Sequence, residues 1–221
     1  MKQTPAHSAV NYDLLNLMPK GCRRVVEIGC SYGALAKAYC ADNENTEYIG
    51  VDIDPEYAEV AESHCTRAFA GNIEELEPAD FDSLFPSDCW VFGDCLEHLK
   101  DPWTLLKQIR NKIDPDGWLL ACIPNAQNWD VQMRLATGQF FYEDSGLLDR
   151  THIRWFTRIT MIDMFQSTGW KIESCLRRNF PSPAEQILPT IAAMAQAAGF
   201  DPETAIQDAI TFQYVFKVKP A

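Results

Sequence analysis

Short apolar runs alternate with helix-like segments along the first half of the chain, and this order constrains the fold more than any other feature. The runs are rich in β-branched and aromatic residues, and each ends in or beside Gly, Asp or Pro, as buried strands that meet functional turns often do. They are Arg23–Cys30, Glu47–Ile53, Asp88–Asp94 and Gly117–Pro124. The helix-like segments between them are Ala34–Ala41, Pro55–His64 and Pro102–Lys112, the last with Asp101 as its N-cap. The alternation predicts an α/β fold with a doubly wound, mostly parallel sheet.

The alternation stops after Pro124. Residues 125–156 show no sustained period, and a long irregular connection in a compact domain is usually a lid or a binding loop. Further elements are expected beyond it: a helix from the N-cap Thr157 to Thr168, a strand Trp170–Leu176, a helix Pro183–Ala198 and a closing strand Phe212–Pro220. We therefore expect one domain over residues 1–221, with a helical N-terminal segment (1–20), a lid (125–156) and a helical insertion (178–210) before the last strand.

Composition narrows the range of partners. Hydrophobic residues make up 47% of the 221 residues, enough for the core of one α/β domain. The net charge of -12 has the wrong sign for binding a nucleic-acid backbone, so no nucleic acid is expected as a partner. The eight cysteines are scattered and form no C-x-x-C pair, which indicates reduced thiols in a cytoplasmic protein. A run of about 18 apolar residues and a signal-peptide pattern are both lacking, so we expect neither membrane insertion nor export.

The turn after the first predicted strand is "VVEIGCSYGALA" (Val25 to Ala36), in which Gly29 and Gly33 suit a tight strand-to-helix turn that approaches a ligand. The same letters fit G-x-S-x-G, the nucleophile elbow of α/β hydrolases, with Ser31 as nucleophile and His152 downstream. That elbow normally follows several strands, whereas only about 25 residues precede this one. A dinucleotide dehydrogenase would need G-x-G-x-x-G, which the turn lacks.

Together with "YIGVDIDP", this turn resembles the first two motifs of class I S-adenosylmethionine-dependent methyltransferases. The segments "AGNIEEL", "VFGDCLEHLKDPW", "PDGWLLACIPNAQNW" and "GLLDRTHIRWFT" follow in the order seen in a bacterial branch with D-x-L-E-H-L and D-R-T-H-x-R-x-F-T motifs, often associated with glycan biosynthesis. The resemblance implies a Rossmann-like fold with a seven-stranded sheet, a lid after the fifth strand, and S-adenosylmethionine as the methyl donor.

The resemblance also implies which residues bind this cofactor. Glu27, Gly29 and Gly33 match positions around its amino-acid end, where Ser31 replaces the usual middle glycine. Asp52 matches the acid that accepts hydrogen bonds from the ribose hydroxyls, and Asn72 stands where the family usually has an Asp beside the adenine amine. The full expected set is Glu27, Gly29, Ser31, Gly33, Asp52, Ile53, Asn72, Ile73 and Asp94. Glu27 as a solvated strand end, Asp52 as a turn residue and Asn72 as a helix cap are the structural alternatives.

A second group of residues suggests chemistry at the acceptor. "DCLEHL" offers Asp94, Glu97 and His98 at i, i+3 and i+4 just past a strand, and His152 in the lid could join them. Comparable sets in small-RNA terminal-ribose methyltransferases and ubiquinone-pathway O-methyltransferases imply a divalent cation. Asp94, Glu97, His98 and His152 are therefore candidate ligands for Mg, Mn, Fe or Zn, with Glu97, His98 and His152 as catalytic residues. A histidine general base without metal, or a purely structural cluster, remains open.

The lid mixes polar groups with flat apolar side chains, a combination that suits a sugar. The polar candidates for acceptor contacts are Asn125, Arg134, Tyr142, Asp149, Arg150 and Arg154, and the aromatic ones are Trp129, Phe140, Phe141 and Trp155. The sequence therefore predicts O-methylation of a hydroxyl on a saccharide or another small polyol or diol. N-methylation, metal-independent O-methylation and a non-catalytic cofactor-binding module are the alternatives.

Overall fold

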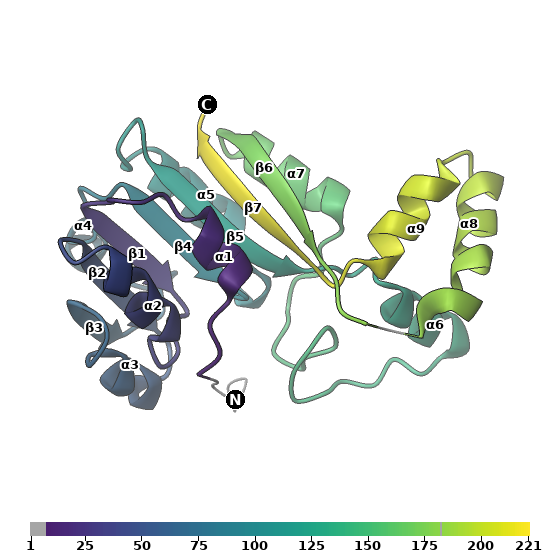
Figure 1. Cartoon of the computed structure of the whole chain (residues 1–221), viewed down its shortest axis with the longest axis horizontal. Coiled ribbons are helices and arrows are strands. Elements are labelled where there is room, and N and C mark those ends of the chain that lie inside the picture. Colours follow the sequence, from purple (N-terminus) through teal and green to yellow (C-terminus); the bar gives the residue numbers. More distant parts are fainter. Residues whose placement is uncertain (1–7, 182) are drawn as a thin grey trace.

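The computed structural model describes residues 8–181 and 183–221. They form one seven-stranded sheet of order β3-β2-β1-β4-β5-β7-β6, flanked by helices (Figure 1). Strand β7 runs antiparallel to both of its neighbours, and the other pairs are parallel. The strands are β1 Arg24–Ile28, β2 Glu47–Asp52, β3 Arg67–Ala70, β4 Cys89–Gly93, β5 Trp118–Pro124, β6 Trp170–Arg178 and β7 Gln213–Pro220. The prediction of a doubly wound, mostly parallel seven-stranded sheet is confirmed.

The helices are α1 Tyr12–Leu17, α2 Ala34–Asp42, α3 Pro55–Ala61, α4 Pro78–Asp82, α5 Pro102–Arg110, α6 Trp129–Thr137, α7 Arg158–Ser167, α8 Leu188–Ala197 and α9 Pro202–Ile210, with 3-10 turns η1 Leu96–His98 and η2 Ala184–Gln186. No helix within the described ranges combines the length and the apolar character needed to cross a membrane. Residues 1–7 of the expected N-terminal helical segment lie outside the described residues.

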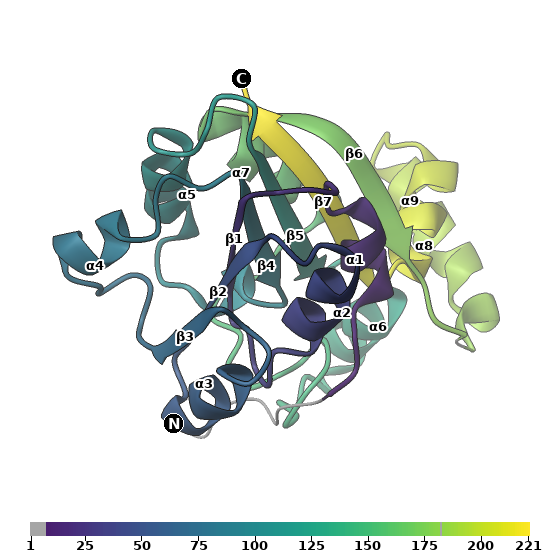
Figure 2. The same ribbon diagram turned by 60° about the vertical axis from the view of Figure 1, so that its left-hand side comes forward.

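Helices cover both faces of the central strands, which explains why the strands read as continuous apolar runs. Helices α1 and α2 lie on one face (Figure 2), where Leu14 of α1 and Tyr39 of α2 pack in a core with Val25 and Val91. The opposite face carries the larger core, in which α5 and α7 contribute Leu105, Leu106, Ile109, Met161 and Phe165. The sheet is therefore sandwiched between two helical layers, and its carboxyl edge stays open to the loops that follow β1, β2, β4 and β5.

Asp-Pro pairs set the beginnings of three helices. Asp54, Asp101 and Asp201 each cap the helix that follows by accepting a hydrogen bond from a backbone N–H of its first turn. Each is followed by proline at the first helical position, where the missing N–H costs nothing. The predicted start of α5 is therefore confirmed, and the same signal marks α9, which the sequence analysis had not separated from the rest of the insertion.

The structure differs from the prediction in the lid and in the insertion. The nine-residue helix α6 lies in the lid, where no regular structure was expected. Only Val131 of this helix is buried, and its apolar residues alternate with polar ones, a spacing more typical of a strand than of a helix. A cap by Asn128 and a left-handed Gly138 define its ends. In the insertion, the expected single helix Pro183–Ala198 is replaced by η2 and α8, and the separate helix α9 follows.

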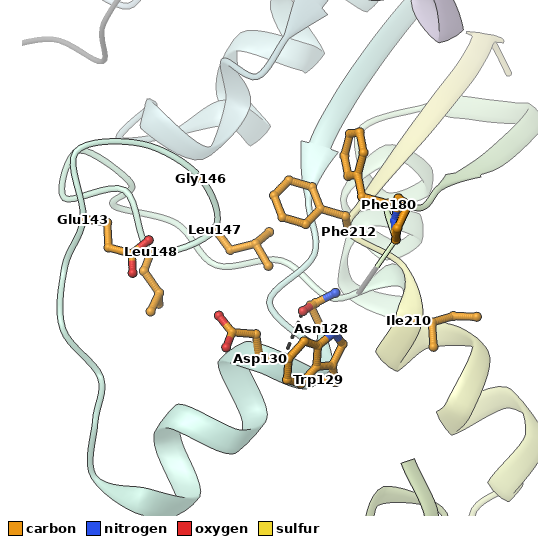
Figure 3. Close-up of a pocket in the computed structure, with 11 residues that line it drawn as sticks. Asn128, Trp129, Asp130, Glu143, Gly146, Leu147, Leu148, Phe180, Ile210 and Phe212 are labelled. Atoms are coloured by element: carbon orange, nitrogen blue, oxygen red, sulfur yellow. Dashed lines mark hydrogen bonds between the residues drawn. The ribbon is translucent and has the colours of Figure 1, made fainter. Parts of the chain in front are cut away.

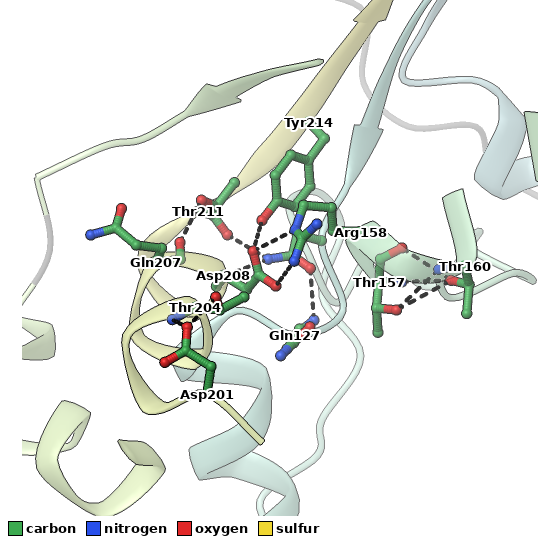
Figure 4. A network of polar contacts seen from close by, with 11 residues as sticks. Gln127, Thr157, Arg158, Thr160, Asp201, Thr204, Gln207, Asp208, Thr211 and Tyr214 are labelled. Carbon is green, nitrogen blue, oxygen red and sulfur yellow. Dashed lines mark hydrogen bonds and ion pairs between the residues drawn. The ribbon is translucent and has the colours of Figure 1, made fainter. Parts of the chain in front are cut away.

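A buried ion pair joins the insertion to the sheet (Figure 4). The carboxylate of Asp208 on α9 accepts hydrogen bonds from Arg158 Nε (2.8 Å) and Nη2 (3.1 Å) on α7 and from the Tyr214 hydroxyl (2.6 Å) on β7. Its side chain is only 2% exposed. Helix α7, some 50 residues earlier in the sequence, therefore meets the consecutive elements α9 and β7 at one carboxylate.

Replacing Asp208 with Ala should lower the free energy of unfolding by about 3 to 5 kcal/mol, because the Arg158 guanidinium and the Tyr214 hydroxyl would lose their buried partner. The matched control is Asp114→Ala, whose ion pair with Arg23 is exposed to solvent and should cost at most about 1 kcal/mol. Urea denaturation of the two variants measures both values. Equal losses would contradict a structural role for the buried pair.

Candidate functional site

The turn after β1 has the positive-φ backbone conformation that glycine favours, although its middle residue is a serine. Gly29, Ser31 and Gly33 all have positive φ, at 75°, 49° and 72°. The backbone N–H of Ser31 donates to Asp52 Oδ2 at 2.8 Å, which holds this less favourable conformation in place. A Cβ on Gly33 would lie 3.2 Å from the Cα of Ala61, so glycine lets the start of α2 approach α3 closely. A hydrolase nucleophile would be hydrogen bonded to a general base, but the Ser31 hydroxyl has no hydrogen-bond partner among the described residues.

Two buried carboxyl groups stand beside this turn. Asp52 ends β2, where its two oxygens accept from the N–H groups of Ser31 and Asp54 (2.9 Å), and burial raises its pKa. Glu27 in β1 is 5% exposed and accepts from the Tyr48 hydroxyl at 2.9 Å. Burial raises the pKa of Glu27 to about 8, even though that hydrogen bond acts in the opposite direction. Glu27 is therefore not the solvated strand end that was one alternative.

The remaining expected cofactor residues surround the same edge of the sheet. Asn72 follows β3, and its Oδ1 accepts from Glu74 N at 3.1 Å, so it caps a turn as well. Ile73 is buried in the main core, whereas Ile53 is 53% exposed beside the end of β2. The carboxyl ends of neighbouring parallel strands thus bring together the residues that the sequence predicted as one group.

The lid brings His152 onto the turn after β4. Its Nε2 lies 3.8 Å from Glu97 Oε1, and Nε2 of His98 lies 4.0 Å from the same oxygen. One ligand atom from each of these three residues lies within 4.8 Å of the other two. The expected approach of His152 to Glu97 and His98 is therefore present; we call these residues the Glu97 cluster.

Hydrogen bonds orient both imidazoles toward Glu97. Nδ1 of His152 lies 3.2 Å from the carbonyl oxygen of Leu147, and Nδ1 of His98 lies 3.1 Å from that of Thr151. Because a carbonyl only accepts, each Nδ1 carries the proton in the neutral ring. Each Nε2 is left with its lone pair on the side that faces the carboxylate.

When Glu97 is ionised, the Glu97 cluster therefore contains hydrogen-bond acceptors and no donor. Glu97 is 1% exposed, and neither of its carboxyl oxygens has a hydrogen-bond partner among the described residues. Burial, together with Asp94, raises the pKa of Glu97 well above its usual value. Burial lowers the pKa of His98, and burial beside His98 lowers that of His152 to about 4. Two neutral imidazoles and a buried carboxyl group fit a divalent cation, which would supply the missing positive charge.

Asp94 is the fourth residue expected in this group, but it is not one of the three whose ligand atoms converge. It is exposed, has a φ of 53° and accepts a hydrogen bond from Gln213 Nε2. The amide of Gln213 is itself oriented by Arg178, whose Nη1 donates to Gln213 Oε1 at 2.7 Å. Sequence reasoning missed Gln213 and Arg178, because they lie on β7 and β6, far from Asp94 in the sequence, and approach it only when the sheet forms.

The polar lid residues expected to contact an acceptor are largely paired within the protein. Asn125 requires a correction: it is fully buried, and its amide donates to the carbonyls of Asp208 and Thr211, so it holds the insertion. Arg134 pairs with Asp130 and Glu143, Arg150 pairs with Asp144, and Arg154 donates to the Lys100 carbonyl. Tyr142 is 57% exposed at the edge of the lid. Asp149 is buried and hydrogen bonded to Thr151.

A cavity of about 360 Å³ lies between the lid and the insertion (Figure 3). Aromatic faces from Trp129, Phe180 and Phe212 line it, together with Leu147 and Leu148 of the lid. The carboxylates of Asp130 and Glu143 add polar groups to the wall. Leu147 connects the cavity to the Glu97 cluster, because its carbonyl accepts the Nδ1 proton of His152.

Known proteins share both the sequence pattern and the fold. Residues 8–175 match the family described as a methyltransferase domain. A ubiquinone biosynthesis O-methyltransferase from Paracidovorax citrulli is 23% identical over 180 residues, covering 73% of this chain and 72% of the relative. This match favours a methyltransferase over the hydrolase, dehydrogenase and non-catalytic alternatives.

Solved structures agree on the fold. An S-adenosylmethionine-dependent methyltransferase from Mesorhizobium loti has a TM-score of 0.61 at 14% identity, over 94% of this chain and 96% of its own. The magnesium protoporphyrin IX methyltransferase of Synechocystis, solved with bound SAH, has a TM-score of 0.59 at 10% identity, over 93% of this chain and 77% of its own. The chain belongs to the methyltransferase domain family and is an S-adenosylmethionine-dependent methyltransferase.

Proposed function

We propose that this enzyme methylates a hydroxyl group of a saccharide or another small diol, and that the Glu97 cluster holds a divalent cation beside that hydroxyl. The observation that carries the proposal is the buried carboxyl group of Glu97, which faces two imidazole lone pairs and has no proton donor among the described residues. The relative named as an O-methyltransferase of ubiquinone biosynthesis supports oxygen as the methylated atom. Methylation of nitrogen is the alternative.

The cofactor site that we propose lies along the ends of β1, β2 and β3. Asp52 suits the ribose hydroxyls, since its carboxylate is already held in place by two backbone N–H groups and keeps further lone pairs. Glu27 suits the cofactor's ammonium group, because its carboxyl group can ionise when that cation binds and the site is sheltered from water. Gly29, Ser31 and Gly33 supply the backbone path between them, and Ile53, Asn72 and Ile73 lie toward the adenine end.

Asp52→Ala should weaken the binding of S-adenosylhomocysteine by tens-fold, since it removes a charged acceptor worth roughly 2 to 3 kcal/mol. Asp42→Ala, at the exposed end of α2, serves as the control with the same change of charge. Isothermal titration calorimetry measures both affinities. If Asp52→Ala bound as tightly as the wild-type protein, the ribose would have to lie elsewhere.

Cofactor binding at pH 7 should release a proton from Glu27. In the ligand-free protein its pKa of about 8 keeps it protonated at pH 7, and contact with an ammonium group favours the ionised form. The measured binding heat should therefore depend on the ionisation enthalpy of the buffer, and Glu27→Gln should remove that dependence. The raised pKa also makes stability depend on pH, because folded Glu27 holds its proton up to a higher pH than unfolded Glu27 does. Relative to Glu27→Gln, the wild-type protein should therefore lose stability as pH rises from about 4.5 toward 8. A wild-type binding heat independent of buffer would contradict this role.

The residues of the Glu97 cluster would act on the acceptor. Glu97, His98 and His152 would hold the cation, and Asp94 remains a candidate for a further ligand or a cofactor contact. A cation bound there acts as a Lewis acid that lowers the pKa of the acceptor hydroxyl. The lid carries His152 and covers Glu97, so closing it both completes the ligand set and excludes water. The lowered pKa of His152 makes it a poor general base at neutral pH, which disfavours the metal-independent alternative.

The cavity between lid and insertion is the acceptor site that we propose. Flat faces of Trp129 and Phe180 suit the apolar face of a sugar ring, while Asp130 and Glu143 suit its hydroxyl groups. Arg134, Tyr142, Arg150 and Arg154 lie in the lid and remain candidates for its outer contacts. A net charge of -12 makes nucleic acid an unfavoured acceptor. The cytoplasmic location suggested by the cysteines stays a prediction.

Glu97→Gln and His152→Asn should each lower kcat severely while changing cofactor affinity less than about twofold, because these groups act on the acceptor. Both should also weaken Mn²⁺ binding in calorimetry, whereas Glu203→Gln, on the exposed first turn of α9, should leave it unchanged. Chelator should abolish turnover, and added Mg²⁺ or Mn²⁺ should restore it. If the enzyme kept full activity in chelator and its rate fell with pH near an imidazole pKa, the cation proposal would be wrong and a histidine general base would be favoured.

A further inference from the structure

Asp149 organises the lid turn that faces the Glu97 cluster. This carboxylate is 1% exposed, and its Oδ1 accepts hydrogen bonds from the backbone N–H of Thr151 (2.7 Å) and from the Thr151 hydroxyl (2.6 Å). The carbonyl of Asp149 also accepts from the backbone N–H of His152 at 3.1 Å. One aspartate thus fixes the two residues that approach His98 and Glu97.

The turn presents two oxygens of Thr151 to the ring of His98. Thr151 Oγ1 and the Thr151 carbonyl oxygen each lie 3.1 Å from His98 Nδ1. The single hydroxyl proton of Thr151 is directed at Asp149, so toward His98 the hydroxyl can only accept. Both oxygens therefore require a proton on Nδ1, and Nε2 keeps its lone pair.

We propose that Asp149 is a positioning residue: it holds the Thr151 hydroxyl as an acceptor and so fixes His98 as the Nδ1–H tautomer, with Nε2 facing Glu97. The hydrogen bonds of the lid are sufficient to assign the His98 tautomer. The effect of Asp149 on a bound cation rests on the proposed function, since a metal ligand needs the lone pair of Nε2. Asp149 would then act at the cluster through Thr151.

Loss of the carboxylate would free the threonine hydroxyl. Without Asp149 that hydroxyl can rotate and donate its proton to His98 Nδ1, which moves the ring proton to Nε2. The Thr151 carbonyl opposes this change, so a mixture of tautomers is expected in place of one. Removing the hydroxyl as well would leave only the carbonyl and restore the Nδ1–H form.

Histidine-ring ¹⁵N NMR of metal-free protein at pH 8 tests this chain of bonds. The His98 signals are assigned from their absence in His98→Asn. Wild type should show the proton on Nδ1, Asp149→Ala should gain the Nε2–H tautomer, and Asp149→Ala/Thr151→Val should return to Nδ1–H. Asp149→Asn, which keeps an acceptor oxygen, should resemble wild type. Thr46→Val, which loses an equally buried hydroxyl bonded to the Cys22 carbonyl, should change nothing at His98.

The double variant distinguishes two roles of Asp149. If Asp149 only stabilised the lid, changing Thr151 as well would make the defect worse, whereas a role in fixing the His98 tautomer predicts a return to the Nδ1–H form. A proton on Nε2 of His98 in wild type would overturn the proposal, even if Asp149→Ala fails to fold. An unchanged tautomer in folded Asp149→Ala, or no return in the double variant, would also overturn it.

Mn²⁺ titration of the same proteins measures the functional consequence. Asp149→Ala should bind Mn²⁺ roughly 10- to 100-fold more weakly than wild type, and Thr46→Val should match wild type. Equal affinities for wild type and Asp149→Ala would overturn the link from Asp149 to the cation. If wild type bound no Mn²⁺ while the tautomer changed as expected, the cation in the proposed function would fail and the positioning role would stand.

Discussion

The candidate site depends on one carbonyl group, that of Glu97, which accepts hydrogen bonds from the backbone N–H groups of both Ile153 and Arg154 at 3.0 Å. These bonds hold the lid over the turn after β4. The lid is also closed at its base, where Ala126 N donates to the Phe156 carbonyl at 2.8 Å. Main-chain bonds do not depend on side-chain rotamers, so they position His152 beside Glu97 with little freedom. The long lid thereby becomes a defined wall of the site.

Closing the lid buries a carboxyl group among neutral imidazoles, which is unfavourable for a charged Glu97. In the absence of a cation the protein can meet this cost by keeping Glu97 protonated, and its raised pKa expresses that response. The lowered pKa of His152 has the same origin, because both shifts reduce the charge inside the cluster. A cation would reverse the preference of Glu97, so metal binding and deprotonation of this residue would be coupled. The Glu97 cluster is thus better suited to hold a charge than to move a proton.

The sequence was sufficient where local chemistry decides the structure. Apolar runs predicted the central strands, and Asp101 before Pro102 predicted the start of α5. Helix α6 was missed because it buries only Val131 and its apolar residues alternate with polar ones instead of following a helical period. Asn125 was misread as an acceptor contact because its partners on α9 lie more than 80 positions along the chain. Ser31 shows a third case, in which a tertiary hydrogen bond to Asp52 lets a non-glycine residue adopt the turn.

The two halves of the site are attached to the sheet in different ways. The residues expected around the cofactor follow parallel strands that are buried on both faces, so their positions are set by the central core. The proposed acceptor cavity is formed by the lid and the insertion, which reach the sheet through the Glu97 carbonyl and the Arg158–Asp208 pair. Changes in α6 or at the end of α9 can therefore reshape the proposed acceptor cavity without disturbing β1 or β2. The residues expected around the methyl donor are therefore positioned by the sheet, whereas the shape of the proposed acceptor cavity depends on a few polar attachments.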